Sequence, residues 1–176
     1  MSQVTYQIDP AHSSAHFSIR HMMISNVRGE FAKVSGTVIY DSANPANSKA
    51  DASIEISSIS TREPQRDAHL KSADFLDVEK FPLLTFHSKE VSGHDGEWKL
   101  KGDLTLHGVT REISLDVEGP TPEVKDPYAN VRIGATATGK LNRKDFGLTW
   151  NGALEAGGVL VGDEVKLTID IEAIRQ

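Results

Sequence analysis

Apolar residues recur at every second position along most of this chain, and this alternation is the feature that most limits its fold. The clearest runs span 98–106, 113–117, 131–141 and 165–171. A period of two is typical of strands that have one buried and one solvated face, as in antiparallel sheets. We therefore expect an all-β chain.

Weaker strand patterns occupy the first half of the chain. They cover residues 4–8, 14–21, 27–41, 50–59 and 83–92. Within 27–41 the apolar residues Phe31 and Val34 are out of phase, which predicts a β-bulge near Lys33. Eight or more strands with short connections favour an up-and-down barrel or a sandwich.

One long segment, residues 61–82, breaks the alternation. Its spacing is helical, because four residues fall at i, i+3, i+4 and i+7 on one face: Arg66, His69, Leu70 and Ala73. Pro64 suits the first turn of a helix, and Phe81-Pro82 indicates a return to extended chain. We expect a short helical insertion around residues 62–77 that packs on the sheet as a lid or plug.

The composition excludes several classes of protein. A chain of 176 residues fits one domain, 1–176, and a net charge of −6 argues against a nucleic-acid partner. The absence of cysteine excludes disulfides, thiol nucleophiles and thiolate metal sites. No stretch approaches the 18 consecutive apolar residues of a membrane-spanning helix, so we expect no integral membrane segment.

The first residues, MSQVTYQIDPAHSS, lack the basic and apolar regions of a signal peptide. The expected location is therefore the cytoplasm, or the periplasm if a leader had been removed from the chain.

Small residues interrupt the apolar face of one predicted strand. Ala135, Ala137 and Gly139 stand where larger side chains would fill the interior of a barrel. An eight-stranded barrel is about the size at which the interior is either filled or holds one small ligand. Small residues would leave room for a ligand, although they would also suit the taper of the barrel or close helix packing. From the residues alone, we favour the barrel taper or close helix packing over a ligand space.

No arrangement of residues indicates catalysis. The chain has seven histidines but no HExxH-type spacing, so no metal site is expected. It has neither a GxSxG elbow nor a glycine pattern that leads from a strand into a helix. We expect no catalytic residue, no cofactor and no enzymatic activity.

Three cationic side chains have open roles. Arg66 and His69 share the helical face that must pack on the sheet, and a polar group turned inward needs a partner. That partner is either a ligand or the protein itself, for example a salt bridge from Arg66 to Asp9. Arg143, in LNRKDFGL, has the same two interpretations, and we favour a surface charge on a hairpin.

Seven segments, in order along the chain, carry a resemblance to a known family. They are YQIDPAHSSAHFSIRH (6–21), VRGEF (27–31), QRDAHLKSADFLDVEKFP (65–82), LTFHS (84–88), GDLTLHGVTREISL (102–115), GATATGKLNRKDFGL (134–148) and VGDEVKLTIDIE (161–172). With these segments the chain resembles the YceI-like family of lipocalin-like polyisoprenoid-binding proteins.

The resemblance implies an eight-stranded antiparallel, up-and-down, lipocalin-like barrel with an elongated apolar tunnel. The tunnel would hold an isoprenoid lipid, such as a polyprenyl alcohol, its phosphate or an isoprenoid quinone, and the protein would be a homodimer. The apolar positions that match the family pattern, and that we expect to line the tunnel, are Phe17, Ile19, Phe31, Phe75, Leu76, Phe86, Trp98, Leu100 and Phe146. Arg66, His69 and Arg143 are the candidates for contact with a head group.

Three functions follow as hypotheses. The first is a non-catalytic carrier that holds the lipid for transport. The second is an enzyme that acts on the head group, suggested by Arg66 and His69. The third is a stress or interaction protein whose cavity is incidental.

Overall fold

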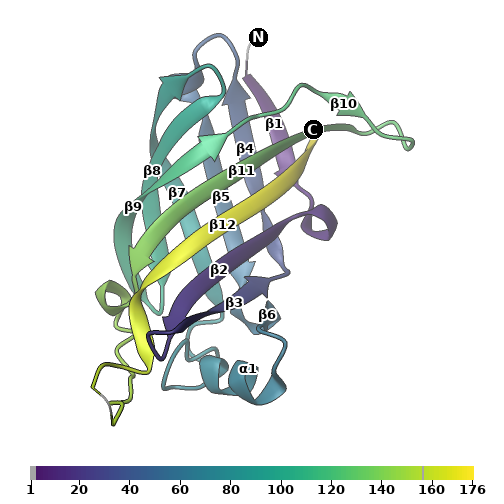
Figure 1. The fold of residues 1–176 in the computed structure, drawn as a ribbon. Coiled ribbons are helices and arrows are strands. Elements are labelled where there is room, and N and C mark those ends of the chain that lie inside the picture. Colours follow the sequence, from purple (N-terminus) through teal and green to yellow (C-terminus); the bar gives the residue numbers. More distant parts are fainter. Residues whose placement is uncertain (1–2, 156) are drawn as a thin grey trace.

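The chain folds into a closed antiparallel barrel with one short helix at one end (Figure 1). The computed structural model describes residues 3–155 and 157–176. Its strands are β1 (Gln3–Ile8), β2 (Ser14–His21), β3 (Ser25–Phe31), β4 (Val34–Asp41), β5 (Lys49–Glu55), β6 (Ile59–Ser60), β7 (Leu83–His94), β8 (Glu97–Leu106), β9 (Val109–Glu118), β10 (Val124–Lys125), β11 (Val131–Asn142) and β12 (Val161–Arg175). The all-β fold expected from the alternation is confirmed, and so is the lipocalin-like barrel that the family resemblance implies.

Among the described residues, the named strands combine into eight barrel strands. β1 and β2 run in the same direction along one side of β12, so together they form one bent strand. β3 and β4 form the next strand, and β5 and β6 pair with them as the third. β7, β8, β9, β11 and β12 complete the wall, and the pairing of β12 with β1 and β2 closes it.

The irregularity expected near Lys33 is a break between β3 and β4. Phe31 and Val34 are both buried, and the two residues between them carry the chain around a bend. The opposite strand bends at the same place, where Ile56–Ser58 form a 3-10 turn and Glu55 N donates to Lys33 O at 3.1 Å. The alternation of inward and outward side chains shifts by one residue across the bend, so Phe31 and Val34 both face inward.

The helix α1 (Pro64–Lys71) is shorter than the helical spacing predicts. It begins after Glu63, whose carboxylate accepts hydrogen bonds from Gln65 N and Arg66 N, with proline in the first turn as expected. It ends at Lys71, and residues 72–80 continue as turns. Ala73 therefore leaves the helical face and is exposed, so its predicted place in the packing face is wrong.

The two ends of the barrel differ (Figure 1). One end, here the α1 end, carries α1, the β2–β3 hairpin and the segment 147–160 between β11 and β12. The other end carries both chain termini and an arm, residues 119–130, that contains β10. Tyr6 donates to Glu123 at 2.8 Å, and Arg175 contacts the same carboxylate at 3.1 Å, which attaches the arm to the wall.

The hydrophobic core lies inside the barrel. Its buried residues come from most strands of the wall, and half-buried apolar residues of β8, β9 and β12 pack against them. A tight turn at His107-Gly108 joins β8 and β9, and both residues have positive φ, as in a type I′ hairpin turn. The polar face of each strand lies outward, which leaves the interior to apolar side chains.

Candidate functional site: an apolar cavity along the barrel

An apolar cavity of about 440 Å³ occupies the interior of the barrel. This volume lies within the range of about 300–1,000 Å³ that is typical of small-molecule sites. The cavity reaches the terminus end at Tyr40, Trp98 and Pro120, and it reaches the α1 end at His69 and Leu160. Its length along the barrel suits an elongated ligand more than a compact one.

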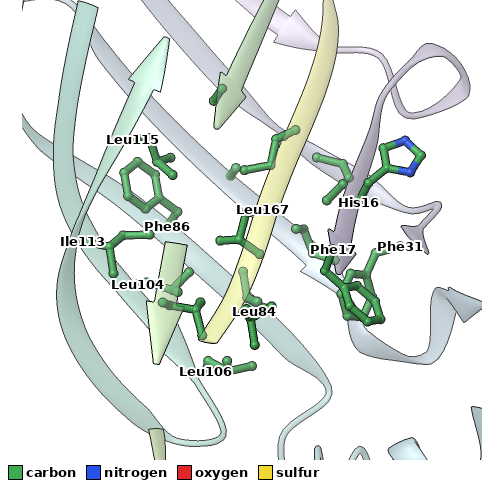
Figure 2. Close-up of a pocket in the computed structure, with 18 of the residues that line it drawn as sticks. His16, Phe17, Phe31, Leu84, Phe86, Leu104, Leu106, Ile113, Leu115 and Leu167 are labelled. Atoms are coloured by element: carbon green, nitrogen blue, oxygen red, sulfur yellow. The ribbon is translucent and has the colours of Figure 1, made fainter. Parts of the chain in front are cut away.

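Several side chains that point into the barrel are not fully buried. Leu100, Leu167 and Ile169 line the cavity and are only half-buried. Figure 2 shows Leu167 and other side chains projecting into this space from several strands. Because these residues face the interior, their residual exposure is exposure to the cavity.

Two aromatic rings form the part of the wall made by β2 and β3. The ring centroids of Phe17 and Phe31 lie 5.6 Å apart (Figure 2). Gly29, opposite Phe17 in the hairpin, makes room for this ring, since a Cβ there would lie 2.4 Å from Phe17 Cζ. A larger residue at position 29 would therefore displace the Phe17 ring.

Eight of the nine residues predicted to line a tunnel do line this cavity. They are Phe17, Ile19, Phe31, Phe75, Leu76, Phe86, Trp98 and Leu100. Phe146 does not: it belongs to a 3-10 turn that follows β11, is 1% exposed, and packs into the core outside the cavity. Its predicted place in the lining is corrected, because the strand ends at Asn142 and the turn redirects its side chain.

The small residues of β11 have two different roles. Ala135 and Ala137 line the cavity, so their short side chains widen it. Gly139 instead allows close packing, because a Cβ there would lie 2.7 Å from Leu115 Cδ2. Both interpretations of the small residues therefore hold, at different positions on one strand.

An aromatic cluster borders the cavity at the α1 end. His69 meets Phe75 and Trp150 edge-on, with ring centroids 5.0 Å and 4.9 Å apart, and Phe75 and Trp150 lie 5.0 Å apart. The His69 Nε2 atom is 2.9 Å from an Asp74 carboxylate oxygen. The cluster joins α1 and the turn after it to the segment 147–160, and all three rings line the cavity.

Arg66 borders the same end of the cavity but is bonded to the protein. Its Nε donates to Thr61 Oγ1 at 2.8 Å and its Nη2 donates to Thr61 O at 2.6 Å. The suggested salt bridge to Asp9 is wrong, since Asp9 binds Arg132 at 2.7 Å. The residue as a whole is exposed to solvent, and it also borders the cavity.

Arg143 is buried, and its predicted place as a surface hairpin charge is wrong. Its side chain is 3% exposed, and it donates to the carbonyl oxygens of Leu148 (2.6 Å), Trp150 (2.9 Å) and Gly162 (2.8 Å). Burial lowers the pKa of the guanidinium, and the nearby Asp163 carboxylate opposes this effect. Arg143 thus holds the segment 147–160 on the barrel, next to the cavity that it also lines.

An ionic network closes the wall near the terminus end. Arg132 on β11 contacts Asp9, Asp126 and Glu172, at 2.7, 2.7 and 2.9 Å. Hydrogen bonds from Arg132 lower the pKa of Asp9 and of Asp126 to about 2. The network joins β11, β12, the arm and the bend between β1 and β2.

The described residues contain no group of three histidine or acidic side chains placed to bind a metal ion. Across residues 3–155 and 157–176, no helix is long and apolar enough to cross a membrane.

Two lining residues at the α1 end, Trp150 and Leu160, escaped the sequence prediction. They lie in an irregular segment without periodicity, where alternation gives no direction for a side chain. The available signal was composition, because a tryptophan in a glycine-rich loop is a large apolar group that needs a partner. Inward residues of the regular strands, such as Leu115 and Leu167, were readable from the alternation itself.

The closed barrel, its helix and its apolar cavity define a lipocalin-like barrel protein. The model of the YceI-like domain matches residues 6–173. A UPF0312 protein of Staphylococcus aureus is 40% identical over 168 residues, which is 95% of each chain. The chain belongs to the YceI-like family, as the sequence resemblance indicated.

Solved structures share the fold. A YCEI protein of Campylobacter jejuni superimposes with a TM-score of 0.73 at 33% identity, and the match covers 89% of this chain and 90% of that one. A polyisoprenoid-binding domain from Saccharophagus degradans gives 0.69 at 15% identity, over 98% and 99%. The second likeness concerns the fold alone.

Proposed function

We propose that this protein is a non-catalytic carrier that holds one long-chain isoprenoid lipid in its barrel. The observation that supports this most is the long apolar cavity, in which aliphatic and aromatic residues face each other along the barrel. The solved polyisoprenoid-binding domain with the same fold adds support for this class of ligand.

The tail provides the binding free energy. Each CH₂ group removed from water contributes about 0.8 kcal/mol, so a few isoprene units suffice for tight binding. The aliphatic and aromatic side chains that line the cavity would contact the methyl branches of an isoprenoid chain along its length. The polar residues then need only orient the head group.

The head group lies at the α1 end in this proposal. Arg66 and His69 are the polar side chains of α1 that border the cavity there. The Arg66 guanidinium suits a phosphate, and the His69 ring suits the edge of a quinone or a hydroxyl. A polyprenyl alcohol, its phosphate and an isoprenoid quinone are the candidate ligands. Self-association as a homodimer and a cytoplasmic location stay predictions.

Organic-solvent extraction of freshly purified protein, followed by mass spectrometry, tests the proposal. We expect close to one isoprenoid molecule per chain. A barrel that is empty after purification, and whose melting temperature does not respond to added polyprenyl lipids, would contradict it.

A further inference from the structure

The tip of the β2–β3 hairpin is apolar and exposed. Met22, Met23 and Ile24, here called the apolar tip, are 41%, 58% and 75% exposed. They project from the α1 end of the barrel, where the turn joins β2 to β3 (Figure 1). Three consecutive exposed apolar residues at the end of a hairpin leave a large uncompensated surface in water.

The backbone of this turn is unusual for its sequence. Met22 has φ 51° and Met23 has φ 63°, and Ile24 N donates to His21 O at 3.1 Å. Two consecutive residues of positive φ form a type I′ turn, for which asparagine and glycine are the favoured residues. Methionine at both positions is locally unfavourable, so turn formation does not explain these side chains.

The apolar tip is held against the neighbouring segment. Met22 N donates to Leu160 O at 2.8 Å, and a Cβ on Gly158 would lie 2.1 Å from Met23 Sδ, so Met23 rests on that glycine. Val159 beside it is 42% exposed and extends the apolar surface. The backbone contacts keep the exposed side chains on one side of the barrel end.

The same hairpin borders the cavity and carries positive charge. Arg20, His21 and Leu160 line the cavity directly behind the apolar tip. The hairpin carries one acidic residue, Glu30, near the end of β3 that is remote from the tip and 3.8 Å from His16, whereas the chain as a whole has a net charge of −6. Arg20 and Arg28 are both exposed on this hairpin. The part of the hairpin next to the tip therefore carries positive charge, which is complementary to an anionic surface.

We propose that the apolar tip inserts into the head-group region of an anionic lipid bilayer and places the α1 end of the cavity against the membrane. Methionine and isoleucine would enter the acyl boundary, while Arg20 and Arg28 would remain among the lipid phosphates. This docking extends the proposed carrier function, because a lipid with a long apolar tail would then move between bilayer and cavity without crossing water.

Site-specific fluorescence tests the docking. Because the chain has no cysteine, Ile24→Cys and Tyr128→Cys each accept one environment-sensitive nitrobenzoxadiazole label. Tyr128 is also exposed but lies on the arm at the opposite end. Vesicles of phosphatidylcholine with phosphatidylglycerol should shift the emission of the label at residue 24 to the blue and leave the label at residue 128 unchanged. Equal responses, or none at residue 24, would overturn the proposal.

Vesicle flotation of unlabelled protein separates the apolar and the charged parts. Replacing all three tip residues with serine should reduce the fraction of protein that floats with the vesicles about tenfold, whereas the Tyr128→Ser variant should bind as the parent protein does. Arg20→Gln and Arg28→Gln should each weaken binding to anionic vesicles about fivefold, and salt should weaken it further. Serine variants that float like the parent would overturn the proposal.

Two further outcomes have a definite meaning. A blue shift that rises with protein concentration without vesicles would assign the tip to a second copy of the chain, and would overturn membrane docking. Mass spectrometry of the same preparations reports the lipid in the cavity. A protein that carries isoprenoid but ignores vesicles would overturn the docking alone, and an empty protein that binds vesicles through its tip would support docking and count against the carrier.

Discussion

The imidazole of His69 on α1 meets the indole of Trp150 edge-on, with ring centroids 4.9 Å apart, and this pair connects the helix to the segment between β11 and β12. Both rings border the cavity. The contact therefore joins two irregular parts of the chain across the end through which, in our proposal, the lipid enters and leaves.

Removal of the Trp150 indole should make the α1 end of the cavity more open. We expect Trp150→Ala to release a bound fluorescent polyprenyl analogue about tenfold faster than the parent protein, because two aromatic contacts are lost. Stopped-flow transfer to acceptor vesicles measures the rate. Tyr128→Ala, which removes an exposed ring outside the cavity, is the control. Equal release rates for Trp150→Ala and the parent would show that the aromatic cluster does not limit exchange.

Replacement of Arg143 should be costly because its charge-assisted hydrogen bonds satisfy several backbone carbonyls. Arg143→Met should lower the free energy of unfolding by about 2–4 kcal/mol, measured by urea denaturation. The neighbouring Lys144→Met should change it by less than about 0.5 kcal/mol, because the Lys144 ion pair with Asp163 is half exposed. Similar stabilities for the two variants would contradict the assigned role of Arg143.

The ionic network around Arg132 predicts a loss of stability in acid. Asp9 and Asp126 have a pKa of about 2 in the folded protein, below the ordinary value of 3.8. A lowered folded-state pKa stabilises the fold above about pH 4, and this contribution disappears as the pH falls through about 2. Urea midpoints between pH 5 and pH 2 should therefore decrease steeply for the parent protein.

The variant Arg132→Gln provides the comparison for that pH profile. It should be less stable at neutral pH and should show a flatter decrease in acid, since the pKa of each carboxyl group returns toward its ordinary value. Lys99→Gln, which removes an exposed pair with Asp116, should leave the profile unchanged. Parallel profiles for the parent and Arg132→Gln would place the acid sensitivity elsewhere.

The regular strands were predictable from the sequence because one physical constraint, a dry interior and a wet exterior, acts on every second residue. The inward positions of Phe17, Phe86 and Leu100 follow from it directly. Beyond the end of a regular strand, the alternation no longer predicts which way a side chain points. Phe146 was expected in the lining from the family pattern, and the 3-10 turn after Asn142 places it outside the cavity.

The polar residues were less predictable because their partners are distant in sequence. Arg143 reads as a surface charge until the fold brings the carbonyls of Trp150 and Gly162 around it. Arg132 and Asp9 are 123 residues apart, and no local pattern joins them. The end of helix α1 at Lys71, which exposes Ala73, is likewise decided by the turns that follow.

A lumen-blocking substitution with a matched control on the same strand tests the carrier function most directly. Ala137 lines the cavity, whereas the adjacent Thr138 is exposed on the outer face. Ala137→Phe places a ring in the path of the tail, and Thr138→Phe adds the same ring outside. Circular dichroism and the melting temperature establish that both variants fold.

Native mass spectrometry of the parent protein and these two variants is the decisive measurement. We predict that the parent and Thr138→Phe carry the mass of one isoprenoid lipid per chain, and that folded Ala137→Phe carries none. A parent protein that shows no bound lipid even after incubation with polyprenyl phosphate and isoprenoid quinone, or an Ala137→Phe variant that retains as much lipid as the parent, would contradict the account.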